Sequence, residues 1–440
     1  MAEPLKVGLA GLGTVGTAVA QLLERGREKL VARCGRPIEI VAVSARSRAK
    51  KREVDLHKFR WVSDPVALAA DPQIDVLVEV VGGAGNPAKS AVETALAAGK
   101  AVVTANKALL ARHGHPLALL AERHGVALNF EASVAGGIPI VKTLREALNG
   151  NAFTRIYGIL NGTCNYILSR MEEDRLPFDA CLREAQRLGY AEADPSFDVE
   201  GRDTAQKLSI LASLAFGVRI DPTAIYVEGI SSITLADLDA AAGLGYRVKL
   251  LGVAVKTDSG IEQRVHPTMV PKESAIAQVM GVTNAVTVDA AGLTPITLVG
   301  PGAGGMATAS AVVSDLADIA RGVRTPPFGR PAARMTAIRK APMQHHEGGY
   351  YIRLLARDRP GSAATIARRL AQQQISLESI VQHQQIPAQR GSRSGRSDEP
   401  VPVILVTYAT SEDAVRKALA AVRRDRVISG RPQVIRIEKN

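Results

Sequence analysis

The chain has 440 residues, of which 46% are hydrophobic and 22% charged, which is ordinary for a globular protein of about three domains. Its formal charge of +12 comes from Lys and Arg that are spread along the chain and not clustered. This spread, the 4% share of aromatic residues and the absence of a Cys/His finger exclude the usual nucleic-acid-binding patterns. No apolar run approaches the ~20 residues of a membrane-spanning helix. Cys34, Cys164 and Cys181 form neither a disulfide pattern nor a metal pattern. We therefore expect a cytoplasmic protein without nucleic-acid or membrane partners.

Residues 1–130 alternate short apolar runs with segments of helical periodicity. The apolar runs are rich in Val, Ile and Leu and cover 5–10, 38–45, 76–81, 101–105 and 126–132. Residues 15–30 and 86–99 carry apolar side chains at helical spacing. Strands that alternate with helices in this way predict a doubly wound α/β domain with a parallel sheet.

A glycine-rich turn follows the first predicted strand. Gly11, Gly13 and Gly16 have the G-x-G-x-x-G spacing, and Thr14 and Val15 lie within the motif where a helix begins. A preceding strand and a following helix are the context in which such glycines bind a dinucleotide. The first glycine permits the tight turn, the second lets the backbone approach a pyrophosphate, and the third lets the helix pack closely. The motif therefore predicts a Rossmann-type domain that binds its ligand at a helix N-terminus.

The end of the second predicted strand bears on which dinucleotide is bound. An NAD site usually has Asp or Glu there for the ribose 2′-hydroxyl, whereas this chain has Ser44, Arg46 and Arg48 and no early acid. A guanidinium group binds a 2′-phosphate in a bidentate way. We therefore predict NADP as the cofactor, with Arg46 as a ligand, and keep NAD as the alternative.

The pattern changes after residue 130. Residues 131–323 mix predicted strands at 153–160, 246–255 and 284–290 with predicted helices at 176–189, 204–217 and 305–322, which indicates an α+β domain. Residues 324–348 form a proline-rich linker. Residues 349–440 have the ferredoxin-like order βαββαβ, with Ser411 as a helix cap and an exposed polar loop at 389–400.

Two stretches of the second region carry polar side chains that suit a reaction centre. Asp203 and Lys207 lie four residues apart and share one face of a predicted helix. An exposed pair at this spacing contributes only about 0.3–0.5 kcal/mol, whereas a buried pair would suit proton transfer. Thr163 lies where a strand gives way to a helix, so it fits either a carboxylate ligand or a simple helix cap.

The chain resembles homoserine dehydrogenases of the longer form, which carry a C-terminal ACT domain. The resemblance is nearly full length and rests on GLGTVG (11–16), TANK (104–107), EASVAGGIPI (131–140), NGTCNYIL (161–168), GYAEADPSFDVEGRDTAQKL (189–208) and PGAGGMATASAVVSD (301–315). It implies a reversible NAD(P)-dependent interconversion of L-homoserine and L-aspartate 4-semialdehyde, a step toward threonine and methionine.

The resemblance also implies roles for individual residues. Lys207 would transfer the proton of the substrate hydroxyl, which requires a pKa lowered by burial or by a neighbouring cation. Asp203 would hold the substrate and orient Lys207, Glu192 would bind the substrate ammonium, and Thr163 would lie at its carboxylate. Lys107 would lie between the nicotinamide and the substrate.

The same resemblance implies further cofactor and metal ligands. Gly82 ends a predicted strand and would let the cofactor approach, and Gly189 and Gly304 would lie near the nicotinamide. Plain turn glycines are the alternative for all three. A structural sodium ion would be bound by the Glu131 carboxylate and by backbone carbonyls, which come from Val134, Gly136 and Ile138. A buried polar turn without an ion is the alternative for this segment.

The C-terminal region resembles an ACT domain, in which the DRPGS turn (358–362) is the usual ligand position. L-Threonine is the implied feedback inhibitor, and a domain kept only for oligomerisation is the alternative. The implied assembly is a homodimer or homotetramer. Two other functions stay open at this point, namely another NADP oxidoreductase acting on a small amino-acid-derived aldehyde, and a non-catalytic amino-acid sensor.

Overall fold

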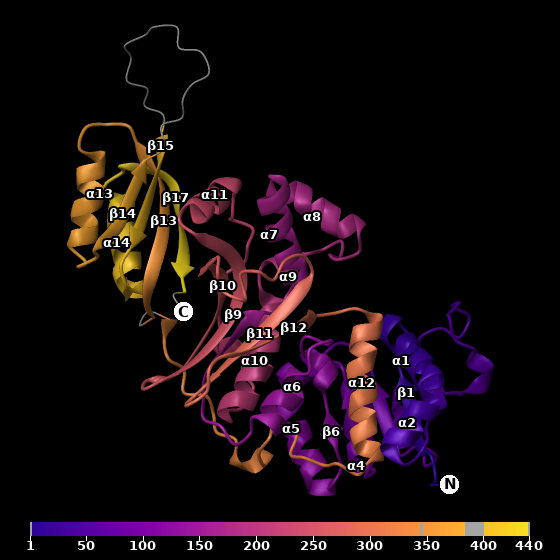
Figure 1. The fold of residues 1–440 in the computed structure, drawn as a ribbon. Helices are drawn as coiled ribbons and strands as arrows, with labels where there is room; N and C mark the ends of the chain where they lie inside the picture. The colour runs from indigo at the N-terminus through magenta and orange to yellow at the C-terminus, as the bar shows by residue number, and fades with distance from the viewer. Residues whose placement is uncertain (1, 344–345, 383–399, 439–440) are drawn as a thin grey trace.

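The structure, a computed structural model, describes residues 2–343, 346–382 and 400–438. Of the polar loop predicted at 389–400, all but Pro400 therefore lies outside the described residues. The molecule is elongated, with the N-terminal domain at one end, the C-terminal domain at the other and a mixed sheet between them (Figure 1). Within the described part of the chain, no helix is both long and apolar enough to cross a membrane.

The N-terminal domain is built on a parallel sheet of six strands in the order β3-β2-β1-β4-β5-β6. Its strands are β1 (Leu5–Ala10), β2 (Ile38–Ser44), β3 (Arg60–Trp61), β4 (Val76–Glu79), β5 (Ala101–Thr104) and β6 (Leu128–Asn129). Its helices are α1 (Thr14–Arg25), α2 (Arg27–Cys34), α3 (Pro65–Ala70), α4 (Ala88–Ala97) and α5 (Lys107–His124). The strand order confirms the predicted doubly wound fold. The helix predicted at 15–30 is divided, because α1 ends at Gly26 and α2 begins after it.

Helix α12 (Gly305–Ala320) packs on this first domain although it follows the second sheet in the sequence. Ala309, Val312 and Leu316 belong to the same buried cluster as Leu9 and Val19. Figure 1 shows α12 beside α1, although most of the chain separates the two helices in the sequence. The helices that cover the N-terminal sheet therefore include one from much later in the sequence.

The second region is built on a mixed sheet with the strand order β12-β11-β7-β9-β10. Its strands are β7 (Phe153–Ile159), β8 (Tyr226–Val227), β9 (Tyr246–Thr257), β10 (Gly260–Pro271), β11 (Thr283–Ala290) and β12 (Ile296–Pro301). Its helices are α6 (Ile140–Lys142), α7 (Gly162–Asp174), α8 (Phe178–Arg187), α9 (Ser196–Val199), α10 (Arg202–Phe216) and α11 (Leu235–Gly243). The sequence did not predict β10, because its buried residues include several polar ones, namely Glu262, Gln263, Arg264, His266 and Thr268.

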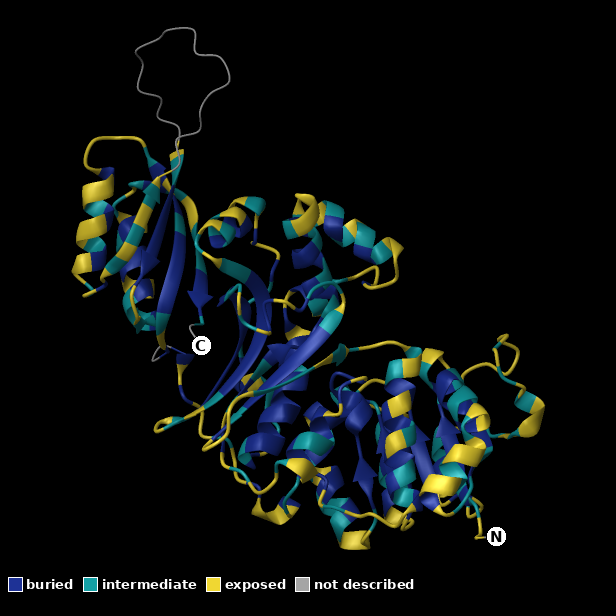
Figure 2. Ribbon diagram, in the orientation of Figure 1, coloured by how far each residue is buried: buried dark blue, intermediate teal, exposed yellow. Residues whose placement is uncertain are grey.

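The C-terminal domain has the predicted order βαββαβ, with one additional short strand. Its elements are β13 (Glu347–Arg357), α13 (Ser362–Ala371), β14 (Leu377–Gln382), β15 (Pro400–Thr407), β16 (Thr410–Ser411), α14 (Glu412–Arg424) and β17 (Ile428–Ile437). The Ser411 side chain accepts a hydrogen bond from the Ala414 N–H, which confirms the predicted cap. Figure 2 shows buried strands running through this domain and through the mixed sheet, with exposed residues on the outer helix faces.

Strand β17 joins the C-terminal domain to the second region in one continuous sheet. It pairs in parallel with β10, where Thr268 lies opposite Arg436. The Arg436 side chain is fully buried and forms ion pairs with Glu228, which follows β8, and with Glu412 of α14. Elsewhere in the contact, Asp237 of α11 accepts a 2.7 Å hydrogen bond from Arg353 of β13. The contact between the two domains therefore contains paired charges as well as apolar residues such as Ile435 and Ile437, which belong to the buried cluster of the second region.

Candidate active site

The glycine-rich turn between β1 and α1 has the shape that a dinucleotide needs. Gly11 has φ +109°, and a Cβ there would lie 2.6 Å from the Val80 carbonyl oxygen. A Cβ at Gly16 would lie 2.0 Å from the Gly11 carbonyl oxygen, whereas a Cβ at Gly13 would have no atom within 4 Å. Helix α1, which begins at Thr14, has no side-chain cap at its N-terminus. The first N–H groups of α1 are therefore open to a phosphate in front of Gly13.

The basic turn after β2 is tied to this loop by a residue that the sequence reasoning did not single out. Arg46 is exposed. Arg52 donates a 2.9 Å hydrogen bond from Nε to the Leu12 carbonyl and a 2.8 Å bond from Nη2 to the Ser47 carbonyl. In the sequence Arg52 is one of several basic residues between 46 and 52. Only the fold shows that Arg52 holds this turn against the glycine loop.

Two cavities meet at the edge of the N-terminal domain. The smaller, of about 250 Å³, lies on the cofactor side and is lined by Val15, Gly82, Lys107 and Lys207 among others. The larger, of about 710 Å³, is lined by seven of the predicted site residues, which are Lys107, Thr163, Gly189, Glu192, Asp203, Lys207 and Gly304. Because Lys107 and Lys207 line both cavities, they mark the place where a cofactor and a substrate would meet.

Asp203 lies at the centre of a buried ion-pair cluster. Its carboxylate is 2.7 Å from the Lys207 ammonium and 3.2 Å from the Lys107 ammonium. Asp203 is 4% exposed and Lys207 9% exposed, so the interpretation as a solvated surface pair is wrong. Lys207 also donates a 2.7 Å hydrogen bond to the Leu160 carbonyl. Burial alone would raise the pKa of Asp203, but the two lysines and its hydrogen bonds bring it down to about 2.

Asn161 organises the same centre and was not predicted. Its Oδ1 accepts a 2.8 Å hydrogen bond from the Cys164 N–H, which makes it the cap of α7. Its Nδ2 donates to Asp198 at 2.7 Å and to Asp203 at 2.9 Å. Thr163 is not the cap, because its hydroxyl donates a 2.6 Å hydrogen bond to the Tyr190 carbonyl. An uncharged amide in a helix-start motif gives no sequence signal of such a double role.

The other predicted substrate and cofactor residues lie around the rim of the larger cavity. Glu192 is exposed and lines it from the loop after α8, next to Gly189, whose φ is +78°. Gly304 lines the same cavity from the start of α12, with φ +116°. Neither glycine would bring a Cβ within 4 Å of another atom, so the backbone at both positions is free to approach a ligand.

The predicted sodium loop contains a buried carboxylate. The Glu131 carboxylate is 2% exposed and accepts hydrogen bonds from the N–H groups of Val141 at 2.9 Å and Lys142 at 2.7 Å. Burial, and then the neighbouring Asp315, raise the pKa of Glu131 to about 7. The ammonium of Lys142 lies 3.3 Å from Asp315 and balances part of the charge of these two buried carboxylates. No cluster of three His, Cys, Asp or Glu side chains that would hold a metal occurs among the described residues.

The remaining three metal ligands implied by the resemblance lie in this loop, where Val134 and Ile138 are buried. Gly136 lies against α12, since a Cβ there would be 2.9 Å from Thr308 Oγ1. Ala135 between them has φ +47° and lines the cofactor-side cavity. The loop thus links the candidate ion site to the wall of the cofactor site.

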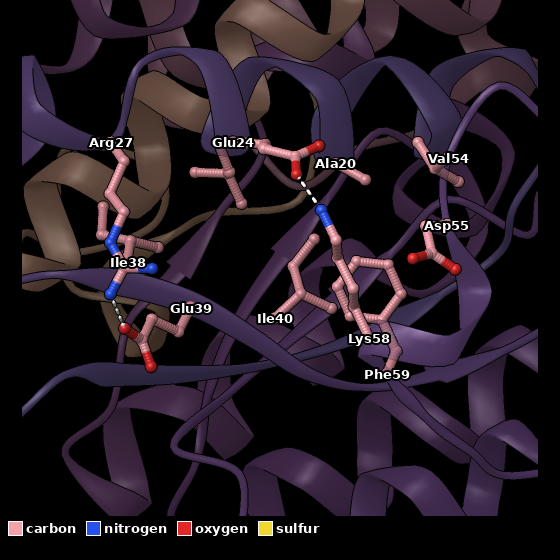
Figure 3. A pocket seen from close by; sticks show the side chains of 11 residues that line it. Ala20, Glu24, Arg27, Ile38, Glu39, Ile40, Val54, Asp55, Lys58 and Phe59 are labelled. Atoms are coloured by element: carbon pink, nitrogen blue, oxygen red, sulfur yellow. Dashed lines mark hydrogen bonds and ion pairs between the residues drawn. The ribbon is translucent and has the colours of Figure 1, made fainter.

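A separate groove of about 250 Å³ lies between α1 and β2 (Figure 3). Its polar side chains are already paired, since Arg27 contacts Glu39 and Lys58 contacts Glu24. It is lined by Ile38–Ile40 at the beginning of β2, whereas ligands of doubly wound sheets bind beyond the carboxyl ends of the strands. The groove is therefore not part of the candidate active site.

Comparisons with known proteins agree along the whole chain. A family model described as homoserine dehydrogenase, NAD binding domain, matches residues 11–131, a homoserine dehydrogenase model matches 139–317, and an ACT domain model matches 350–424. The homoserine dehydrogenase of Pseudomonas aeruginosa is 44% identical over 443 residues, which cover 99% of each chain.

Solved structures give the same result. The structure of a homoserine dehydrogenase from Thiobacillus denitrificans has a TM-score of 0.91 at 42% identity and covers 99% of each chain. A hyperthermophilic archaeal homoserine dehydrogenase in complex with NADPH has a TM-score of 0.61 at 27% identity, over 72% of this chain and 97% of that one. With its dinucleotide loop, its buried lysine–aspartate centre and relatives that match it from end to end, the chain belongs to the homoserine dehydrogenase family.

Proposed function

We propose that the protein interconverts L-homoserine and L-aspartate 4-semialdehyde with NADP(H) as its preferred cofactor, on the pathway to threonine and methionine. The observation that carries the proposal is the cluster of Lys207, Asp203 and Lys107 at the junction of the two cavities. One cavity adjoins the glycine loop through Val15, and the other contains the polar residues that suit an amino acid. A sensor without catalysis would not need two lysines at that junction.

Lys207 is the proposed proton-transfer residue. A nicotinamide nucleotide held by the glycine loop at Gly11–Gly16 would supply the hydride transfer at the carbinol carbon of homoserine. In the reducing direction the Lys207 ammonium, stabilised by Asp203 at 2.7 Å, gives a proton to the developing alkoxide. In the oxidising direction the neutral amine takes the hydroxyl proton. Lys107, 3.2 Å from the other oxygen of Asp203, adds positive charge where the alkoxide forms.

The larger cavity offers separate places for the charged groups of the substrate. The exposed carboxylate of Glu192 is the proposed partner of the ammonium group. The N-terminus of α7, with Thr163 in its first turn, is the proposed partner of the carboxylate, because N–H groups and the helix dipole favour an anion there. Asp203 would orient the hydroxyl between these two ends.

The preference for NADP rests on Arg46, whose exposed side chain follows β2 where a 2′-phosphate would lie. The complex of an archaeal relative with NADPH is consistent with this choice. We predict that Arg46→Ala raises the KM for NADP about tenfold and changes the KM for NAD less than twofold, the loss of one charge-assisted contact being worth about 1.4 kcal/mol or more. Equal changes for the two nucleotides would refute the assignment.

Two further features belong to the proposal. L-Threonine would bind at the 358–362 turn of the ACT domain and inhibit the enzyme, and pairs of chains would form a homodimer or homotetramer. Gly361, with φ +90°, leaves the N-terminus of α13 uncovered by a side chain, which supports a ligand at this turn. Light scattering of the purified protein with and without threonine measures the assembly.

A structural sodium ion at the loop 131–138 is also proposed, with Glu131 and the carbonyl oxygens of Val134, Gly136 and Ile138 as ligands. The paired burial of Glu131 and Asp315 supports it, because a cation there offsets their repulsion. We expect a higher midpoint of thermal unfolding in sodium chloride than in choline chloride at equal ionic strength. Identical midpoints over a wide concentration range would contradict the ion site.

The proposed function is tested by the absorbance of the reduced nicotinamide. Purified protein is mixed with L-homoserine and either NADP or NAD, each with and without L-threonine. Reduction that is faster with NADP and slower with threonine is the expected result. Protein that binds NADP but reduces it with another small amino alcohol and not with homoserine would favour a different aldehyde as substrate.

A further inference from the structure

Asn284, the second residue of β11, is buried without satisfying its side chain. It is 1% exposed, and neither its Oδ1 nor its Nδ2 has a hydrogen-bond partner among the described residues. Leaving a buried amide without hydrogen bonds destabilises the folded state, and such groups are rare in folded proteins. An uncompensated cost of this kind indicates a partner that the chain itself does not supply.

The neighbouring Asn165 on α7 shows what a structural asparagine looks like in the same region. Its Nδ2 donates to the carbonyls of Val279, Gly281 and Thr283, at 2.9 to 3.2 Å. Its Oδ1 accepts a 3.0 Å hydrogen bond from the buried Lys249. Asn165 therefore holds the 279–283 loop in place, and Asn284, immediately after that loop, is left free for another partner.

The position of Asn284 identifies the cavity that would supply this partner. The residue lines the larger cavity, together with Gly162 and Thr163 at the start of α7, but it does not line the cofactor-side cavity. Its amide lies against Gly302, since a Cβ at that glycine would be 2.1 Å from both Cγ and Nδ2 of Asn284. A Cβ at Gly162 would lie 3.5 Å from Oδ1 of the same amide. The amide is thus fixed between a glycine of the 301–304 loop and the N-terminus of α7.

We propose that Asn284 is a substrate-binding residue that recognises the α-carboxylate of the amino-acid substrate. Its Nδ2 donates to a carboxylate oxygen that also faces the N–H groups of α7. An amide suits this place because its N–H groups donate to a carboxylate and the side chain adds no charge of its own. The inference rests on the proposed function, and it adds a contact that fixes which end of the substrate enters this part of the cavity.

The test compares Asn284→Ala and Asn284→Asp with Asn149→Asp, which adds the same charge at an exposed position of the same domain. Loss of one hydrogen bond to a charged group predicts a KM for homoserine raised about tenfold in Asn284→Ala. Asn284→Asp places a carboxylate against the substrate carboxylate and predicts a rise of about a hundredfold. In both variants kcat changes less than about threefold and the KM for NADP stays the same, as does the far-ultraviolet circular dichroism.

Two competitive inhibitors identify the group that Asn284 binds. L-2-Aminobutyrate keeps the ammonium and the carboxylate of homoserine, whereas 3-aminopropan-1-ol keeps the ammonium and the hydroxyl. We expect Asn284→Asp to raise the inhibition constant of the first about as much as the KM for homoserine, and to leave that of the second unchanged within about twofold.

Three results would overturn the inference. An unchanged KM for homoserine in both variants would mean that the amide meets only a buried water. A raised KM for NADP instead would place Asn284 at the cofactor, and equal changes for both inhibitors would remove the carboxylate from the contact. Failure of the proposed function is seen separately, because the wild-type protein would then not oxidise homoserine at all.

Discussion

The chain contains two Asp–Lys pairs with identical helical spacing and opposite surroundings. Asp203 and Lys207 on α10 are 2.7 Å apart, with side chains 5% and 11% exposed, and a second lysine contacts the same carboxylate. Asp413 and Lys417 on α14 are 2.6 Å apart, with side chains 43% and 63% exposed. The two distances are nearly equal, so the short contact itself carries no information about function. What differs is burial, the additional cation and the cavity beside the first pair.

The largest expected difference between the two pairs lies in catalysis. Removing a proton-transfer residue lowers a rate by about 10²–10⁴-fold, so Lys207→Ala is expected to reduce kcat by at least about 10³ while NADPH still binds. Initial rates of homoserine oxidation and a fluorescence titration with NADPH measure the two quantities. Loss of NADPH binding together with activity would point to a folding defect and not to proton transfer.

Arg436 separates burial from catalysis, because it is a fully buried charge outside the two cavities. Arg436→Met leaves Glu412, whose side chain is 3% exposed, without its main partner. Breaking a buried ion pair in this way costs about 3–5 kcal/mol, so denaturant unfolding should begin at lower concentration. We expect kcat of the folded variant to stay within about threefold of the wild type. A fall in kcat as large as that of Lys207→Ala would show that losing a buried charge far from the cavities lowers activity equally. The comparison would then not support a catalytic role for Lys207.

The pH dependence of stability sharpens the comparison through Asp203. Its pKa is lowered to about 2 in the folded state, so its charge stabilises the fold above the unfolded pKa near 4, and this contribution is lost as the pH falls toward 2. The difference in unfolding free energy between wild type and Asp203→Asn should include about 2 kcal/mol that disappears over this range. Denaturant titrations at several pH values measure it, and a difference independent of pH would contradict the shifted pKa.

The smallest effect is expected at the exposed pair. Lys417→Ala should change the free energy of unfolding by no more than about 0.5 kcal/mol and leave kcat unchanged, because solvent screens this pair. The same unfolding and rate measurements serve as the control for Lys207→Ala. A loss of activity in Lys417→Ala would remove the distinction between the two helices.

The sequence was informative wherever a function depends on local spacing. The glycines of the β1–α1 turn, the alternation of the first strands and the βαββαβ order follow from short-range patterns, and the structure confirms the fold that they predict. Spacing also put Asp203 and Lys207 on one face. It did not show that this face is buried, because that depends on β7 and α7, which reach α10 through Leu160 and Asn161.

The features that were not predictable depend on partners far away in the chain. The apolar face of α12 indicates a buried helix, but nothing in its residues says that it packs on α1. Strand β10 has buried polar residues whose partners lie far away in the chain, since Glu262 is 3.1 Å from His346 and Thr268 lies opposite Arg436 of β17. The amides of Asn161 and Asn284 gave no signal, since an uncharged residue stands out only when its hydrogen bonds are known.

The most direct test of the central claim is chemical rescue of Lys207→Ala in the homoserine-dependent reduction of NADP. The larger cavity, which Lys207 lines, leaves room for a small amine once the side chain is removed. Added ethylamine is predicted to restore turnover in proportion to its concentration, with no such effect on the wild type. A Lys207→Ala variant that oxidises homoserine at the wild-type rate without any amine would contradict the assignment of Lys207 as the proton-transfer residue.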